Sequence, residues 1–185
     1  MLKLHLAGGV EFDEAKHEYW YRGQRLSGVT GLISKRLGIN MPQEFVEEHR
    51  MEGAHVHKAV QKWIETGKAD SIHPGVKWLI ETFAYHTLCD VPCRVYSEVL
   101  VSDFKRYASA VDIIAESAKG LVMYDIKKGV FKREYVTWRF SIYKYFIEKY
   151  AERKVIACVC ISMKDREYYD IFPKSFEQIE KILYE

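Results

Sequence analysis

The sequence predicts an α/β protein with a mixed sheet flanked by helices. Three strand-like runs, at residues 94–103, 106–116 and 120–128, follow one another with short turns between them, as in an antiparallel meander. A helical pattern over residues 135–151 leads to a further apolar run at 154–162, and a strand–helix–strand connection of this kind places the last strand parallel to its partner. We therefore expect a sheet that is antiparallel first and parallel afterwards.

Residues 1–40 are expected to extend this core at its amino-terminal side. Residues 10–26 alternate loosely between apolar and polar side chains, which predicts a hairpin or a three-stranded flap. A short helix over residues 31–37 follows and ends at Gly38. The flap carries three consecutive aromatic residues that either stack on unpaired bases or anchor the flap to the core: Tyr19, Trp20 and Tyr21.

Two helices are expected between the flap and the meander, over residues 42–67 and 74–88. The first is expected to break near Gly53. Beyond that point its apolar residues recur at spacings of three and four, and His57 lies at the edge of the apolar stripe, facing partly inward. His57 is therefore either a metal ligand or an ordinary, partly buried histidine.

The chain ends with a predicted strand at residues 167–172 and a closing helix that Ser175 caps. Its 185 residues, 48% of them apolar, suffice for one compact domain. It contains no uninterrupted apolar run of 18 residues and no signal peptide, so we expect a soluble, cytoplasmic protein without a membrane partner. Four cysteines either pack in the core as reduced thiols or bind a metal or iron–sulfur cluster, the first being favoured by their spacing: Cys89, Cys93, Cys158 and Cys160.

Charge is distributed unevenly along the chain. The net charge is +2, but residues 105–154 contain 12 basic and 6 acidic residues and carry +6, which leaves −4 for the remainder. A basic segment suits a polyanionic substrate, although a solvated helix face gives the same composition.

Residues 107–127 bring two carboxylates and a lysine together. They predict two strands joined by a short polar turn, and strand alternation places Asp125 and Lys127 on one side with Ile126 on the opposite, packed side. Asp112 then lies on the neighbouring strand, close enough to share a divalent cation with Asp125. Glu98, in the preceding strand, adds a third carboxylate, and such a cluster is costly to bury unless a cation or mutual pairing compensates it.

This order of residues resembles the PD-(D/E)xK nuclease superfamily, most closely its RecB-like and phage exonuclease branch. The matching residues, in chain order, are Gly53, His57, Glu98, Asp112 and Asp125-Ile-Lys127. The resemblance implies a restriction-endonuclease-like core over residues 41–185, with residues 1–40 as a β-hairpin and short helix extension. It also implies hydrolysis of phosphodiester bonds in DNA, single-stranded or at duplex ends, by an exonuclease of recombination, repair or replication such as phages encode.

The resemblance assigns roles within the site. Mg²⁺ or Mn²⁺ would be bound by His57, Asp112, Asp125 and the backbone carbonyl of Ile126. The catalytic residues would be Asp112, Asp125, Lys127 and Glu98. In these roles Lys127 orients the attacking water, and Glu98 binds a second ion or orders water.

Five further residues are expected to contact nucleic acid: Lys128, Lys132, Arg133, Arg139 and Tyr143. In related nucleases the helix after the site bears a Gln followed four residues later by a Tyr, whereas here the pair is Arg139 and Tyr143; a guanidinium suits a phosphate oxygen well. The extra positive charge of Lys128 and Arg139 also supports an alternative, a nuclease-fold module that has lost turnover and binds nucleic acid or a protein. A third interpretation is an ordinary α/β domain in which Asp-x-Lys occurs by chance.

Overall fold

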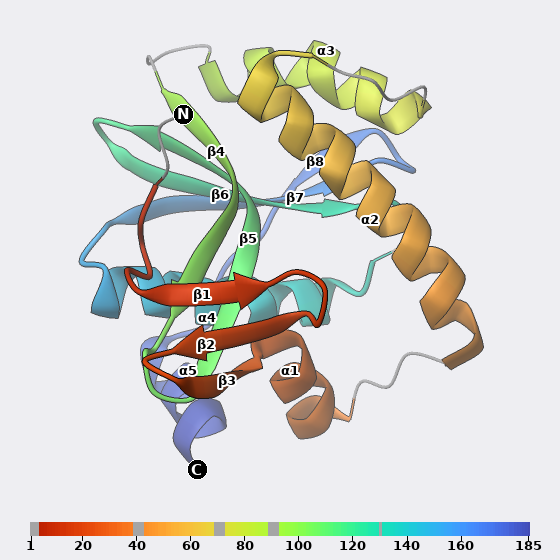
Figure 1. Cartoon of the computed structure of the whole chain (residues 1–185). Helices are drawn as coiled ribbons and strands as arrows, with labels where there is room; N and C mark the ends of the chain where they lie inside the picture. The colour runs from red at the N-terminus through yellow and green to blue at the C-terminus, as the bar shows by residue number, and fades with distance from the viewer. Residues whose placement is uncertain (1–3, 39–42, 69–72, 89–92, 130) are drawn as a thin grey trace.

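The computed structural model describes residues 4–38, 43–68, 73–88, 93–129 and 131–185, and Figure 1 shows their arrangement. Eight strands form one mixed sheet, in the order β1-β2-β3-β5-β6-β7-β8, with β4 paired to the other edge of β5. The expected α/β class with a mixed sheet is confirmed. Among the described residues, no helix combines the length and the apolar character that crossing a bilayer requires.

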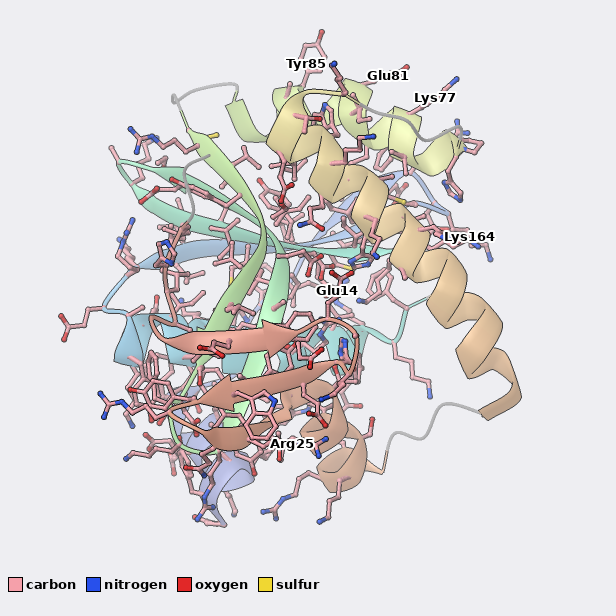
Figure 2. The ribbon with its side chains drawn as sticks, viewed as in Figure 1. Glu14, Arg25, Lys77, Glu81, Tyr85 and Lys164 are labelled. Atoms are coloured by element: carbon pink, nitrogen blue, oxygen red, sulfur yellow. The ribbon has the colours of Figure 1, made fainter. Side chains whose placement is uncertain are left out.

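The amino-terminal strands join the main sheet rather than standing apart from it. β1 (Val10–Asp13), β2 (Glu18–Tyr21) and β3 (Gln24–Gly28) form an antiparallel meander, and the end of β3 pairs in parallel with the start of β5. The turn after β1 also contacts α2, because Glu14, labelled in Figure 2, forms an ion pair with Lys58 in which Oε1 and Nζ are 2.8 Å apart. Helix α1 (Val29–Leu37) follows directly and ends at Gly38, whose φ of 63° is the left-handed conformation that glycine adopts without strain.

Helices α2 (Gln43–Thr66) and α3 (Pro74–Leu88) cover one face of the sheet, as Figure 1 shows. Their buried side chains pack against the sheet in one apolar cluster, which we call the α2/α3 core: Val56, Val60, Val76, Leu79, Phe83, Ile113, Ala115, Tyr124, Ile126, Val159, Ile161 and Met163. The break expected near Gly53 was wrong, because α2 is continuous through it. A glycine inside a helix costs only about 1 kcal/mol, which the packing of Val56 and Val60 later in α2 can offset.

The central strands match the expected meander closely. They are β4 (Arg94–Ser102), β5 (Tyr107–Ser117) and β6 (Gly120–Lys127), each antiparallel to the next. The turn between β5 and β6 requires glycine, because Gly120 has a φ of 139° and a Cβ there would lie 2.8 Å from the Lys154 carbonyl oxygen. The register of β5 and β6 is therefore fixed by this turn.

Helix α4 (Arg133–Tyr150) crosses the opposite face of the sheet and carries the chain to β7 (Val155–Ser162), which pairs in parallel with β6 as predicted. Nine of its residues are buried, since α1 and α5 also pack around it. We call the apolar cluster around α4 the α4 core; besides residues of α4 it contains Val29, Leu32 and Ile33 of α1, Tyr96 and Val99 of β4, Cys158 and Cys160 of β7, and Ile179 and Leu183 of α5. β8 (Glu167–Asp170) closes the sheet, and α5 (Phe176–Tyr184) begins at Ser175, whose side chain and that of Gln178 form a capping box.

The cysteines pack as apolar side chains where the structure describes them. Cys158 and Cys160 are buried in β7 against the α4 core, and Cys93 is partly buried. Burial raises the pKa of the Cys158 and Cys160 thiols to about 12, so both stay protonated at neutral pH. Cys89 lies outside the described residues.

Candidate functional site

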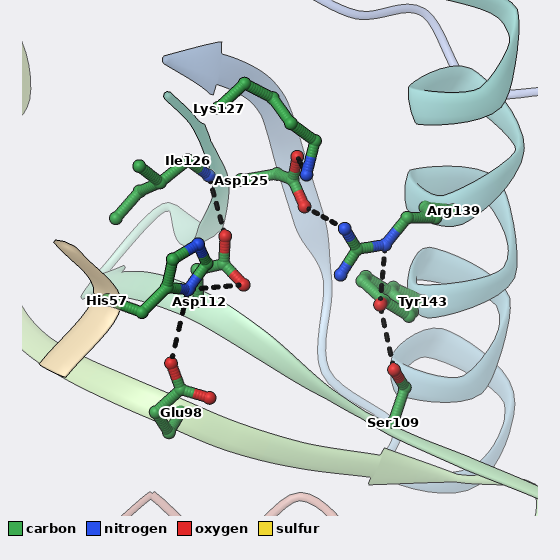
Figure 3. Close-up of polar contacts among 9 residues, drawn as sticks. All are labelled: His57, Glu98, Ser109, Asp112, Asp125, Ile126, Lys127, Arg139 and Tyr143. Carbon is green, nitrogen blue, oxygen red and sulfur yellow. Dashed lines mark hydrogen bonds and ion pairs between the residues drawn. The ribbon is translucent and has the colours of Figure 1, made fainter. Parts of the chain in front are cut away.

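Three elements bring a histidine and two carboxylates together on the α2 side of the sheet (Figure 3). His57 extends from α2, Glu98 from β4 and Asp112 from β5. Nδ1 of His57 lies 3.7 Å from Glu98 Oε1 and 3.6 Å from Asp112 Oδ1. One ligand atom from each residue lies within 4.8 Å of the other two. We call these three residues the acidic triad; one imidazole nitrogen and two carboxylate oxygens form a donor set that fits Mn²⁺ or Mg²⁺.

Glu98 reaches the triad through an irregularity in β4. The pairing of β4 with β5 passes from Ser97↔Ile113 to Val99↔Val111, and Glu98 between them has a φ of 49°. A regular strand would place Tyr96 and Glu98 on the same face, but here Tyr96 and Val99 both enter the α4 core. The left-handed residue thus turns Glu98 away from the apolar core and toward α2, at a cost of about 1 kcal/mol or more.

Asp112 stands where β5 and β6 separate. Their antiparallel register ends at Ile113↔Tyr124, and beyond it β6 continues only with β7. Oδ2 of Asp112 accepts the backbone N–H of Ile126 at 2.7 Å, so the carboxylate replaces the next rung of the ladder. Only 6% of the Asp112 side chain is exposed, and its other oxygen faces His57. The expected packing of the Ile126 side chain is confirmed, because it lies in the α2/α3 core.

The carboxylates of Glu98 and Asp112 place negative charge beside the imidazole of His57. The nearby Asp112 carboxylate raises the pKa of His57, and Glu98 adds to this, whereas burial and Lys127 act in the opposite direction. The two acids therefore favour a cation between them, which is the electrostatic condition that a metal site requires.

Asp125 extends from β6 toward Arg139 on α4, and Figure 3 shows it between Asp112 and Arg139, near enough to the triad for His57 to contribute to lowering its pKa. Its side chain is 3% exposed, with Oδ2 lying 2.5 Å from Lys127 Nζ and Oδ1 lying 2.8 Å from Arg139 Nη1. Burial by itself would raise the pKa of Asp125, but Arg139 and Lys127 outweigh it and hold the pKa below the usual range. The two groups predicted to share one side of β6, Asp125 and Lys127, do so; the structure pairs them with each other and with Arg139.

A short chain of hydrogen bonds orients Arg139. Its Nε donates to the Tyr143 hydroxyl at 3.0 Å, and that hydroxyl lies 2.8 Å from Ser109 Oγ on β5. Tyr143 is only 1% exposed, so it lies behind Arg139 rather than on a surface that nucleic acid could stack upon. Tyr19 of β2 lies beside the same serine: burial raises the pKa of Tyr19, and a hydrogen bond with Ser109 partly offsets this. Of the two interpretations of the flap aromatics, Tyr19 fits the anchor.

The remaining basic residues predicted to bind nucleic acid follow the site in the chain. Lys128 is partly buried just after β6, whereas Lys132 and Arg133 are exposed at the start of α4. Arg133 Nη2 donates to the Asp170 carbonyl oxygen at 2.8 Å, which ties α4 to β8.

The structure thus divides the predicted site residues into two groups. His57, Glu98 and Asp112 face one another, and Asp125, Lys127 and Arg139 form a second, neighbouring group. The sequence patterns did not indicate the contacts of Ser109 and Tyr19, because hydroxyl groups in strands are common. No protein-family model and no curated protein sequence matches the chain.

Proposed function

We propose that this protein is a metal-dependent nuclease that hydrolyses phosphodiester bonds in DNA. The observation that carries the proposal is the acidic triad, beside a buried carboxylate paired with a lysine, at the point where two central strands separate. This arrangement agrees with the resemblance of the sequence to the RecB-like and phage exonuclease branch of PD-(D/E)xK nucleases. An exonuclease of recombination, repair or replication, working in the cytoplasm, is the specific form that we propose.

His57, Glu98 and Asp112 would hold Mg²⁺ or Mn²⁺ as a Lewis acid for a phosphoryl oxygen. Lys127 is the group suited to orienting the attacking water, because its ammonium lies beside the buried Asp125 carboxylate while 22% of the side chain stays exposed. Arg139 offers N–H donors for a phosphate oxygen. The carbonyl of Ile126 and the carboxylate of Asp125 are further oxygen donors in our proposal.

A groove of about 790 Å³ reaches the triad at Glu98, and we propose it as the path of a chain-like substrate. It lies along β4, between α2 and the segment of residues 4–10, and Glu98 forms part of its wall. Its lining contains both apolar residues, such as Leu6 and Ile64, and polar residues, such as Gln61 and Arg94. A mixed lining of this kind suits nucleosides, which present apolar faces and polar edges.

The second candidate is a nuclease-fold module that binds nucleic acid or a protein without cleaving anything. The observation in its favour is the pairing of Asp125 with both Lys127 and Arg139, since two cations at one carboxylate compete with a metal ion for it. Such a module would bind DNA equally well with and without a divalent ion.

Cleavage assays separate the two candidates. Labelled single-stranded and duplex DNA, linear and circular, is incubated with Mg²⁺, Mn²⁺ or EDTA. We expect cleavage of linear DNA with either metal and none in EDTA. Absence of cleavage with both metals, together with metal-independent DNA binding, would favour the module.

Variants assign the roles. Glu98→Gln is expected to weaken Mn²⁺ binding in calorimetry. Lys127→Ala should keep Mn²⁺ binding, because an ammonium has no lone pair for a metal, and it should also keep DNA binding. Its cleavage rate should fall by about 10²-fold or more, because the group that orients the water is lost. Glu81→Gln and Lys77→Ala, at exposed positions on α3 (Figure 2), are the matched controls and should behave as wild type. Unchanged cleavage by Lys127→Ala would remove Lys127 from the mechanism.

A further inference from the structure

Both oxygens of Asp125 are engaged by cationic groups. Lys127 Nζ lies at 2.5 Å from one and Arg139 Nη1 at 2.8 Å from the other, and the carboxylate is almost fully buried between them. A divalent cation that used Asp125 as a ligand would therefore have to displace one of the two. In the acidic triad, the group that faces the two carboxylates is the imidazole of His57, which is itself a metal ligand and not a competing ammonium or guanidinium group.

Arg139 is the partner better placed to leave. Lys127 is two residues from Asp125 on the same strand and face, so it stays beside the carboxylate. Arg139 comes from α4, and its Nε is fixed by Tyr143, which Ser109 holds in turn. The guanidinium is a rigid, planar group, so its terminal nitrogens leave Asp125 when the side chain rotates about its aliphatic bonds, and this rotation also breaks the hydrogen bond from Nε to Tyr143.

A phosphate group is the ligand that would draw Arg139 away from Asp125. Guanidinium groups bind phosphate and carboxylate oxygens with the same forked geometry, and a phosphodiester entering the site presents such oxygens next to the triad. In the described part of the chain, no protein group accepts a hydrogen bond from Nη2 of Arg139, so this nitrogen is available to a phosphate oxygen.

We propose that Arg139 is a positioning residue that exchanges Asp125 for a substrate phosphate and thereby releases Asp125 to bind the metal ion. This inference rests on the proposed function. The binding of phosphate and of the divalent cation is then cooperative: each ligand tightens the binding of the other by the same factor. The fully liganded metal is therefore favoured where a phosphate is present.

Calorimetric titration with Mn²⁺ tests the exchange without any cleavage reaction. Thymidine monophosphate (dTMP) supplies a phosphate with no phosphodiester bond to hydrolyse, and thymidine is the matched control without phosphate. In the wild-type protein, dTMP should tighten Mn²⁺ binding by about five- to tenfold and thymidine should have no effect. Equal Mn²⁺ affinity with dTMP and with thymidine would overturn the proposal.

Arg139→Gln removes the competing charge and keeps an amide that can donate to Tyr143 or Asp125. It should bind Mn²⁺ more tightly than wild type in the absence of dTMP, and dTMP should then add little. Since the weak complex of Mn²⁺ with dTMP in solution is common to all proteins compared, the difference between variants isolates the effect of Arg139. Coupling as strong in Arg139→Gln as in wild type would also refute the exchange.

The outcome distinguishes this inference from the proposed function. If Glu98→Gln weakens Mn²⁺ binding but dTMP does not affect it, the metal site is supported and the exchange is rejected. If neither Glu98→Gln nor dTMP changes Mn²⁺ binding, both the metal site and the exchange are rejected. The comparison of dTMP with thymidine needs only the wild-type protein, so it does not depend on whether a variant folds.

Discussion

Asp112 combines two functions that two substitutions should separate. Its Oδ2 accepts the Ile126 N–H at the fork between β5 and β6, and its Oδ1 faces His57. Asp112→Asn keeps an oxygen for the Ile126 N–H but removes the negative charge. Asp112→Ala removes both. We expect both variants to lose Mn²⁺ binding and only the alanine variant to lose much stability.

The size of the difference follows from burial. Asparagine exchanges a charge-assisted hydrogen bond for a neutral one, which costs about 1 kcal/mol, whereas alanine leaves a buried N–H without an acceptor and costs about 3 kcal/mol in total. For a chain of 185 residues, the resulting gap of about 2 kcal/mol corresponds to roughly 4–8 °C in Tm.

Urea denaturation in EDTA, followed by tryptophan fluorescence, measures the free energies of unfolding, and calorimetry measures Mn²⁺ binding. Glu81→Gln, an exposed acid on α3, is the control for both. If the alanine and asparagine variants unfold at the same urea concentration, the hydrogen bond between Asp112 and Ile126 does not stabilise the fold. If the asparagine variant binds Mn²⁺ like wild type, Asp112 is not a ligand.

Two further predictions concern charge away from the triad. A hydrogen bond from Arg153, with a smaller contribution from Tyr96, lowers the pKa of Glu116 in the folded protein. The ionised carboxylate therefore stabilises the fold at pH values above the ordinary pKa of a glutamate, and this stabilisation is lost as the pH falls through the pKa of the folded state. Glu116→Gln should therefore lose less stability than wild type when Tm is compared at about pH 5 and pH 3; equal losses would contradict this. Changing Lys132 and Arg133 to Glu should weaken DNA binding and reduce the slope of log affinity against log salt by about 2, with unchanged cleavage at saturating DNA. Loss of cleavage at saturation would instead place them in the site.

The sequence predicted the fold well where local chemistry decides it. Gly38 ends α1, Gly120 closes the β5–β6 turn and Ser175 caps α5, and each of these residues acts within a few positions of itself. The parallel addition of β7 followed from the handedness of strand–helix–strand connections. The helix break predicted near Gly53 was wrong, because α2 packs onto the sheet and continues through this residue.

The sequence analysis named the residues of the candidate site but did not predict which of them contact one another. His57, Glu98 and Asp112 were all selected from the sequence, yet the left-handed φ of Glu98 that brings it to the triad has no local signal such as a glycine or an asparagine. The pairing of Asp125 with Arg139 depends on how α4 lies across β6, which no spacing in the chain specifies. Contacts between distant segments are therefore what the structure adds.

The backbone at Glu98 has a consequence for evolution and engineering. Glycine accepts a φ of 49° without strain, and asparagine accepts it with little, so either residue would relieve a penalty that glutamate carries. Selection for thermal stability alone would thus favour replacing Glu98, whereas selection for a working site would retain it. Persistence of glutamate at this position in variants of the chain would therefore report on activity and not on folding.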